Sequence, residues 1–230
     1  MQSRKRLCSG TCEVDPGCMA KPHLSVNMAM TLDGKVMLPD GTWHGLTSPV
    51  DRQTMDLYRS RAQALIVGRN SVEKDNPVFA LKDGSPGPRP IMICRSRLPV
   101  PGLRFFQHDP IIYVPPALTD SDEASQLSQA CEIAALDDPS PAAVLDDLYE
   151  RGFSTVLLEG GPGLNSGFFF ADLVDCLYLT IVPFVLGDSH LPGIVDADTC
   201  IPDFTQRNWK LERCEKIGNE VFTEYHRQRN

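Results

Sequence analysis

The sequence predicts an α/β domain with a mixed, mostly parallel sheet, helices on both of its faces, and a C-terminal antiparallel hairpin. Two observations predict this class. Short apolar runs typical of buried strands alternate along the chain with segments of helical spacing, which is the pattern of parallel strands joined by helices. Residues 209–228 instead alternate apolar and polar side chains on either side of Gly218–Asn219, a pair typical of a hairpin turn.

The first half of the chain contains two of the predicted strands and a helix between them. The strands are residues 23–30, HLSVNMAM, and residues 64–68, ALIVG. Ser48 is placed to cap the helix and Pro49 to begin it, because a serine oxygen satisfies free N–H groups of the first turn and proline needs no partner there. Residues 90–94 and 110–114 are further apolar strands.

The second half continues the alternation. Residues 140–152 predict a helix that starts at Ser140 and ends at Gly152, since glycine tolerates the left-handed conformation that follows many helices. Short strands are predicted at 131–136 and 155–160, a helix at 164–173, and a long apolar strand at 176–187. This last strand could be a buried central strand or part of a dimer interface.

Composition bounds the class of protein. The chain has 230 residues, 42% of them hydrophobic, and a net charge of −8, which favours a soluble globular protein and argues against a nucleic-acid surface. No apolar run approaches the roughly 20 residues of a membrane span, and the N-terminus lacks the apolar segment of a secretory signal. We therefore expect a cytoplasmic protein that binds neither nucleic acid nor membrane.

The eight cysteines fall into two groups. Cys8, Cys12 and Cys18 lie in residues 1–21, which we predict to be a flexible tail; a metal site there would lack a fourth ligand at zinc-finger spacing, so no metal site is predicted. The other five lie mostly beside apolar residues, which is typical of small buried side chains in a reducing compartment.

The stretch LLEGGPGLN, residues 157–165, combines a buried strand, a carboxylate and a glycine-rich turn before a helix. Such a turn presents unpaired N–H groups at the positive end of a helix dipole, and it can bind an anion. We expect the glycines to supply positive φ angles and close approach of a phosphate. A purely structural turn is the alternative, because the spacing matches neither a P-loop nor the usual dinucleotide fingerprint.

Two further stretches gain meaning only in combination. TLDGK, residues 31–35, is by itself an Asp-Gly turn, and VGRNSVEKDNPVF, residues 67–79, is by itself a strand followed by a helical turn and a loop. Several motifs follow one another along the chain: TLDGK, a TSP helix start with Arg59, VGRNSVEKDNP, a strand ending in RSR, LLEGGPGLNSGFF and DLVDCLYLTIVPFVLG. This order resembles the reductase domain of riboflavin biosynthesis, the RibD C-terminal-like family. The resemblance covers about residues 22–227.

This resemblance implies a dihydrofolate-reductase-like fold over residues 22–230 and NADPH as the cofactor. The implied reaction reduces the ribosyl chain of a phosphorylated aminopyrimidine, 5-amino-6-(5-phosphoribosylamino)uracil or its diaminopyrimidine form, to a ribityl chain. The zinc deaminase signature of the two-domain members is not found in this sequence. A reductase of another heterocycle such as dihydrofolate, and a non-catalytic nucleotide-binding module, are the alternatives. A homodimer is expected.

The resemblance also carries over site residues. Glu159 and Lys35 are expected nearest the chemistry, and Asp33 is expected to hold the turn. The cofactor is expected to contact Ala29, Gly45, Ser71, Asp75, Ser96 and the loop Gly161 to Gly167, including Pro162, Gly163, Leu164 and Asn165. The substrate is expected to contact Trp43, Arg59, Phe79, Lys82 and Glu159, with Arg59 and Lys82 anchoring its phosphate.

Two of these residues depart from the family's usual pattern, and two arginines add an expectation about the cofactor. Trp43 stands where a small serine is common in the family, and Lys82 where an arginine is common, so the identity of the heterocycle stays open. Arg95 and Arg97 flank Ser96 and could favour a 2′-phosphate through bidentate contacts, which would select NADPH over NADH.

Overall fold

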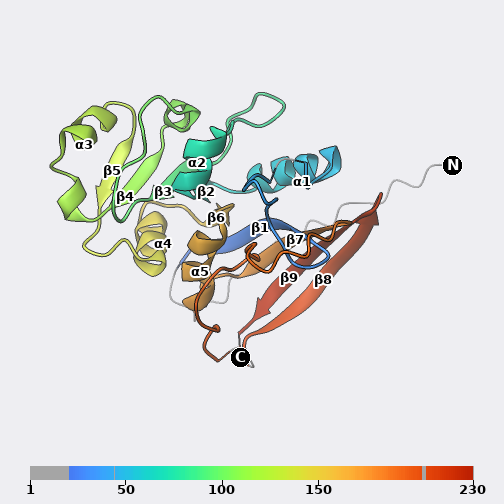
Figure 1. Cartoon of the computed structure of the whole chain (residues 1–230). Helices are drawn as coiled ribbons and strands as arrows, with labels where there is room; N and C mark the ends of the chain where they lie inside the picture. Colours follow the sequence, from blue (N-terminus) through green and yellow to red (C-terminus); the bar gives the residue numbers. More distant parts are fainter. Residues whose placement is uncertain (1–20, 44, 204–205, 230) are drawn as a thin grey trace.

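The computed structural model describes residues 21–43, 45–203 and 206–229. These residues form one nine-stranded sheet in the order β5-β4-β3-β2-β6-β1-β7-β9-β8, which runs across Figure 1 from α3 to the C-terminal strands. The strands are β1 His23–Thr31, β2 Ala64–Val67, β3 Arg89–Ile93, β4 Ile111–Val114, β5 Glu132–Ala135, β6 Thr155–Leu158, β7 Cys176–Val182, β8 Asn208–Ile217 and β9 Glu220–Gln228.

The sheet is parallel from β5 to β7 and antiparallel beyond it. β6 pairs with both β1 and β2, so a strand from late in the chain separates two strands from its beginning. The β8–β9 hairpin turns at Gly218, whose φ is +63°. The predicted mixed, mostly parallel sheet with a C-terminal hairpin is confirmed.

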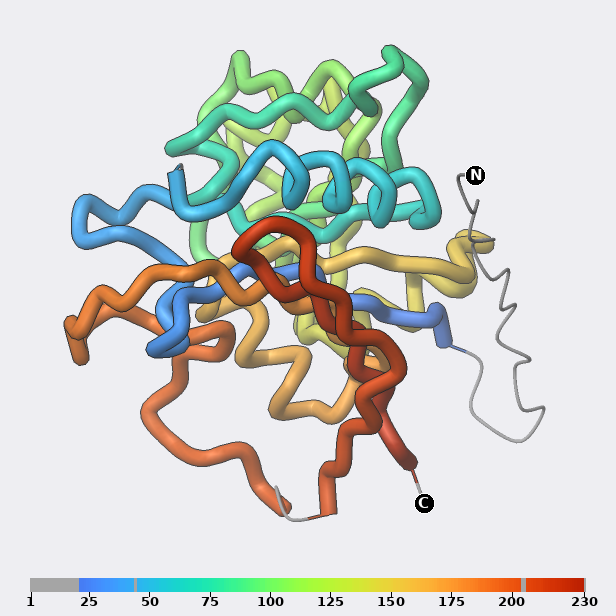
Figure 2. Tube along the Cα trace, turned by 90° about the vertical axis from the view of Figure 1, so that its right-hand side faces the viewer, coloured from blue at the N-terminus to red at the C-terminus, as the bar shows by residue number. Residues whose placement is uncertain are grey.

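Helices cover both faces of the sheet, as the sequence predicts. They are α1 Pro49–Arg59, α2 Arg69–Asp75, α3 Asp122–Leu127, α4 Pro141–Glu150 and α5 Pro162–Phe170, with short 3₁₀ helices at Arg104–His108 and Pro116–Leu118. One apolar cluster joins the sheet to α4 and α5, and a second joins it to α1, α2 and α3. Figures 1 and 2 show α1 and α5 on opposite sides of the central strands.

The helix starts follow from their capping residues. The Ser48 hydroxyl accepts hydrogen bonds from the N–H groups of Val50 at 3.2 Å and Asp51 at 3.3 Å, and Pro49 is the first residue of α1. Ser140 caps α4 in the same way, and Gly152 follows that helix with a φ of +90°. Both predicted caps are confirmed, because capping is decided by a few adjacent residues.

The predicted long strand at 176–187 is too long. β7 ends at Val182 because Pro183 has no N–H to donate to a neighbouring strand. Since β7 pairs with β1 and β9, its apolar character belongs to an internal strand of the sheet. The polar segment at 122–127, for which no element was predicted, is the short helix α3, capped by Ser121.

The glycine-rich loop differs from the prediction in two ways. α5 begins at Pro162, so residues 162–167 are helical and only the turn before them is a loop. None of the glycines at 160, 161, 163 and 167 has a positive φ. Close packing is what requires a glycine at 160: an added Cβ would lie 2.6 Å from a methyl carbon of Leu164 and 3.1 Å from one of Leu158.

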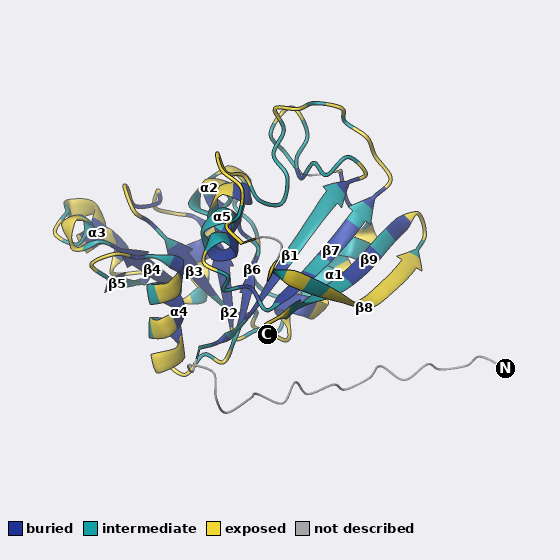
Figure 3. Cartoon of the chain, turned by 90° about the horizontal axis from the view of Figure 1, so that it is seen from below, coloured by how far each residue is buried: buried dark blue, intermediate teal, exposed yellow. Residues whose placement is uncertain are grey.

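The cysteines differ in how far they are buried, and so do the strands of the sheet. Cys94, Cys131 and Cys176 are buried as predicted, whereas Cys200 and Cys214 are exposed. Cys214 is on β8, which forms the exposed edge of the sheet, while β2, β4 and β6 are its most buried strands (Figure 3). The predicted flexible tail with Cys8, Cys12 and Cys18 lies outside the described residues, apart from Lys21.

Candidate active site

A pocket of about 520 Å³ lies between α1, α2 and the carboxyl ends of β2 and β6. This is the edge at which α/β proteins usually bind ligands, where neighbouring strand connections run in opposite directions. Its lining combines apolar side chains from β1, the loop after it and α1 with a small number of polar groups. The predicted site residues among the lining are Ala29, Trp43, Arg59, Ser71, Asp75, Phe79, Glu159, Gly161 and Pro162.

Arg59 and Glu159 form a buried ion pair at one side of this pocket. The Arg59 Nη2 lies 2.6 Å from Glu159 Oε2, and its Nε donates to both carboxylate oxygens at 3.0 and 3.1 Å. Another guanidinium nitrogen, Nη1, donates to the Val78 carbonyl at 3.2 Å. Both side chains are about nine-tenths buried. Burial opposes the charge on Arg59, but the Glu159 carboxylate outweighs it and raises the pKa of the guanidinium.

This pair changes the interpretation of both residues. Arg59 was expected to anchor a substrate phosphate, yet its charge is balanced by Glu159 and its donors are directed to protein oxygens. Glu159 was expected to face the substrate as a separate acid. The structure places it in the pocket lining but holds its carboxylate against α1, so its position is rigidly fixed.

The turn before α5 provides an anion-binding end to the pocket. Gly161 is the N-cap of α5 and Gly68 the N-cap of α2, and neither helix start has a side-chain cap. The two starts converge, because a Cβ added to Gly68 would lie 3.5 Å from the Gly161 nitrogen and 3.7 Å from the Ser71 hydroxyl. Uncapped N–H groups beside a hydroxyl fit a phosphate group of a nucleotide cofactor.

Two further lining residues, Trp43 and Asp75, are joined by a hydrogen bond. The Trp43 Nε1 donates to the Asp75 carboxylate at 3.0 Å, which fixes the indole against the pocket. Phe79 is fully buried and packs edge-on against Phe105. The structure therefore brings five of the ten predicted cofactor residues and four of the five predicted substrate residues to one cavity, although they come from widely separated parts of the chain.

Lys35 does not reach this cavity. Its ammonium donates to the Leu191 carbonyl at 2.8 Å, and Lys35 is not part of the lining. Asp33, expected to hold the turn, accepts hydrogen bonds from the Thr31 hydroxyl at 2.6 Å and the Gly187 N–H at 2.7 Å. These two bonds lower the pKa of Asp33 to about 2.

The remaining predicted residues also lie outside the lining. Lys82 and Ser96 are on exposed loops, and Gly45 is exposed with a φ of +94°. In α5, Gly163 is exposed, Leu164 packs against the core, and Asn165 is buried with its amide donating to the Ile194 carbonyl at 2.8 Å. Asn165 thus orders the segment near residue 194.

The two arginines beside Ser96 differ in their ion pairing. Arg97 forms a bidentate pair with Glu73, at 2.5 and 2.7 Å, and the Glu73 hydrogen bond raises the pKa of Arg97. Arg95 is exposed, and among the described residues it forms no ion pair. Only Arg95 of the two therefore keeps its charge available for a 2′-phosphate.

Sequence reasoning missed five polar residues of the lining, which are Asn27, Thr47, Asp51, Asn70 and Lys74. Asp51, Met55 and Arg59 are spaced by four residues on α1, so all three lie on the face that lines the pocket. That spacing was visible in the sequence once Arg59 was assigned to the site.

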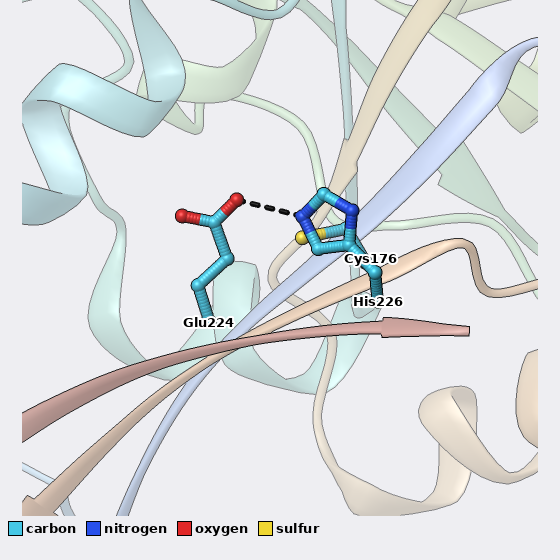
Figure 4. Close-up of side chains that lie close together, drawn as sticks. All are labelled: Cys176, Glu224 and His226. Carbon is cyan, nitrogen blue, oxygen red and sulfur yellow. Dashed lines mark hydrogen bonds and ion pairs between the residues drawn. The ribbon is translucent and has the colours of Figure 1, made fainter. Parts of the chain in front are cut away.

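A separate group of potential metal ligands lies on β7 and β9. Among the described residues, ligand atoms of Cys176, Glu224 and His226 all lie within 4.8 Å of one another. Figure 4 shows the His226 ring directed at Glu224, and its Nε2 is 2.7 Å from the carboxylate. Burial raises the pKa of the Cys176 thiol to about 12. A protonated thiol is a poor ligand, so we assign no metal to this group.

The fold and the pocket together define an α/β protein with one cavity at the carboxyl ends of its parallel strands, lined by two uncapped helix starts and by largely apolar side chains. The RibD C-terminal domain model matches residues 22–223, and the chain belongs to that family. The resemblance drawn from the sequence is confirmed. Membership makes the chain an oxidoreductase of the riboflavin-biosynthesis type and implies a nicotinamide cofactor.

Three curated relatives match this chain, and the two archaeal ones match along most of their own length. The 2,5-diamino-6-ribosylamino-4(3H)-pyrimidinone 5′-phosphate reductase of Methanothermobacter thermautotrophicus is 25% identical over 213 residues, which cover 89% of this chain and 98% of that protein. The Corynebacterium ammoniagenes riboflavin biosynthesis protein RibD is 29% identical over 178 residues, 74% of this chain but 46% of RibD. The chain spans about half the length of such RibD relatives. The same archaeal reductase from Archaeoglobus fulgidus is 23% identical, covering 86% of this chain and 94% of that protein.

Solved structures share the fold. A Thermotoga maritima deaminase/5-amino-6-(5-phosphoribosylamino)uracil reductase superposes with a TM-score of 0.74 at 24% identity, covering 90% of this chain and 57% of that one. A pyrimidine reductase-like protein from Corynebacterium diphtheriae superposes with a TM-score of 0.73 at 18% identity, covering 91% and 93%. The predicted dihydrofolate-reductase-like fold is confirmed. No helix among the described residues has the length and apolar character to cross a membrane.

Proposed function

We propose that this chain is an NADPH-dependent reductase that converts the ribosyl chain of a phosphorylated aminopyrimidine to a ribityl chain. One observation carries the proposal: a single cavity of about 520 Å³ joins the two uncapped helix starts to the Arg59–Glu159 pair. The archaeal relatives named as reductases of such a compound match over nearly their whole length, which supports this substrate class.

The pocket offers a consistent set of groups that would hold the cofactor. The N–H groups at Gly161 and the Ser71 hydroxyl would hold its phosphates, and Ala29 and Asp75 would contact its nucleoside part. When bound, the nicotinamide supplies the hydride. Arg95, on the loop after β3, would favour the 2′-phosphate of NADPH because its charge is not balanced by an ion pair among the described residues.

The chain's own residues would orient the substrate and exclude water from it. The apolar lining, including Met28, Leu46, Met55 and Phe79, removes water from the reacting carbon. The Arg59–Glu159 pair would present a fixed carboxylate oxygen to the substrate hydroxyls. Lys35 and Lys82 keep their proposed roles only if a bound substrate draws their side chains from the positions they occupy in this structure.

A second heterocycle is kept as a candidate because of Trp43. Its indole lines the pocket and is held by Asp75, which gives a rigid flat surface for a planar ring. Dihydrofolate presents such a ring. The substrates are separated by measuring NADPH consumption with the diaminopyrimidine ribosyl phosphate, its deaminated form and dihydrofolate.

Turnover of either ribosyl phosphate supports the proposed function. Turnover of dihydrofolate alone would replace the substrate and keep the enzyme class. Tight NADPH binding without turnover of any of the three would refute the function and favour a nucleotide-binding module. We also infer that the protein is a cytoplasmic homodimer. Light scattering on the purified chain would test its oligomeric state.

A further inference from the structure

The pocket contains a second polar region, separate from the Arg59–Glu159 pair and the helix starts. It is formed by Asp51 in the first turn of α1 and by Thr47 just before that helix. Because Asp51 and Arg59 are eight residues apart on one helix face, their side chains lie about 12 Å apart along the helix axis. The two groups therefore contact different parts of any ligand that fills the cavity.

In the part of the chain that the structure describes, the Asp51 carboxylate has no ion-pair partner. Burial raises its pKa, while the nearby hydroxyls of Thr180 and Thr47 act in the opposite direction. Glu220 raises it further and Arg52 lowers it, but among the described residues Asp51 forms no ion pair. A half-buried carboxylate without such a partner needs hydrogen-bond donors from a ligand or from water.

The other charged groups of the lining already have protein partners. Arg59 is paired with Glu159, the Lys74 ammonium donates to the Gly41 carbonyl at 2.6 Å, and Asp75 accepts from the Trp43 indole. Asp51 is therefore the charged side chain of the lining that is best placed to recognise a ligand by its donors.

Thr47 supplies an independent observation that points to a ligand. Its side chain lines the pocket, the residue is only 8% exposed, and its hydroxyl oxygen has no hydrogen-bond partner among the described residues. The hydroxyl is near enough to Asp51 to affect its pKa, but the geometry is not that of a hydrogen bond. Buried hydroxyls without a partner are uncommon in folded proteins.

The protein holds these two groups rigidly. The N-cap Ser48 lies between them in the sequence, and its N–H and hydroxyl donate to the Glu220 carboxylate at 2.9 and 2.5 Å. This contact fixes the start of α1 to the first residue of β9. Asp51 and Thr47 are therefore positioned before a ligand arrives, which is what a specific binding site requires.

We propose that Asp51 and Thr47 form a subsite that binds the donor edge of a 2-amino-4-oxopyrimidine ring. A carboxylate only accepts hydrogen bonds, and a ring N–H beside an amino group offers two parallel donors to it. The deaminated ring has a carbonyl oxygen in place of the amino group, and this oxygen would face the carboxylate. The subsite therefore selects the diaminopyrimidine over the uracil form. This inference rests on the proposed function for its substrate.

The decisive measurement compares both ribosyl phosphates in the wild type and in Asp51→Asn. We expect the wild type to prefer the diaminopyrimidine by about 10²-fold or more in kcat/KM, since sites built to hydrogen-bond a group reject analogues that lack it. Asp51→Asn should lose most of this preference, mainly through KM, because an amide can donate to the uracil carbonyl. Asp56→Asn, the same change on α1 outside the lining, should leave the ratio of kcat/KM between the two substrates unchanged.

Equal turnover of both forms by the wild type would overturn the inference while leaving the proposed function intact. An equal loss on both substrates in Asp51→Asn would also overturn it, because that result indicates a general structural effect. Thr47→Val should weaken binding of the diaminopyrimidine without lowering the melting temperature, since it removes an unsatisfied buried hydroxyl.

A binding experiment separates the inference from the proposed reaction. Calorimetry with 2-amino-4-oxopyrimidine and with uracil, in wild type and Asp51→Asn, requires no turnover. Selective binding of the amino ring that is lost in the variant supports the subsite even if neither ribosyl phosphate reacts. In that case turnover of a 2-amino-4-oxopteridine, which has the same donor edge, identifies the source of the ring. Absence of any Asp51-dependent preference refutes the subsite.

Discussion

Replacing Glu159 by glutamine should destabilise this protein strongly, because it leaves a buried charge without its counter-ion. Arg59 is 9% exposed and Glu159 10%, and three of their nitrogen–oxygen distances are between 2.6 and 3.1 Å. Removing one partner of such a pair typically costs about 3–5 kcal/mol. At about 2–4 °C per kcal/mol for a chain of this size, the melting temperature should fall by about 6–20 °C.

Urea unfolding followed by circular dichroism measures this loss directly, and Glu73→Gln is the matched control. Glu73 also forms a bidentate pair with an arginine, but Arg97 is half exposed, so breaking that pair should cost less than about 1 kcal/mol. The double variant Arg59→Met with Glu159→Gln removes both charges and should be more stable than Glu159→Gln alone. A cost for Glu159→Gln no larger than that of Glu73→Gln would refute the reasoning.

Three further predictions follow from single positions. Gly160→Ala should lower the free energy of unfolding by about 1–3 kcal/mol in chemical denaturation, because its Cβ would lie 2.6 Å from Leu164. The Cβ of Gly163→Ala would meet nothing within 4 Å, so that variant should be neutral or slightly more stable. Similar losses in the two variants would refute the packing argument. The pKa of Asp33 is about 2 in the folded protein, against an ordinary value of 3.8, so its contribution to stability is present above about pH 4 and is lost as the pH falls towards 2. The fall in melting temperature on acidification should therefore be smaller in Asp33→Asn than in the wild type. An unchanged pH profile of the melting temperature would contradict this. The thiol of Cys176, with a pKa of about 12, should react with iodoacetamide at pH 8 far more slowly than the exposed cysteines. Peptide mass spectrometry measures these rates. Equal rates would contradict this and would indicate that β7 opens readily.

The sequence predicted those features of the fold that are decided by neighbouring residues. Ser48 and Ser140 identified the helix starts, and Gly218–Asn219 identified the hairpin, because caps and tight turns depend on a few adjacent side chains. The end of β7 was predicted too late even though Pro183 marks it, because the apolar run continues past the proline.

The site was harder to predict because it depends on contacts across the chain. Glu159 lines the pocket, but its pairing with a residue 100 positions earlier has no local signal in the sequence. Lys35 was placed near the chemistry, whereas the carbonyl of Leu191 holds its ammonium elsewhere. The glycine at 160 was expected for its backbone freedom, and it is required instead by the packing of Leu164.

The strand order explains why one helix can carry two chemically different ends of the pocket. Because β6 lies between β1 and β2, the connection that contains α1 crosses over it, and the carboxyl end of β6 brings Glu159 under the last turn of α1. The first turn of the same helix is fixed to β9 through Ser48 and Glu220 and lies near Thr180 of β7. Arg59 therefore meets a counter-ion from the sheet, whereas Asp51 meets hydroxyls and a second carboxylate. The topology itself balances the charge at one end of the pocket, whereas among the described residues the carboxylate at the other end has no ion pair.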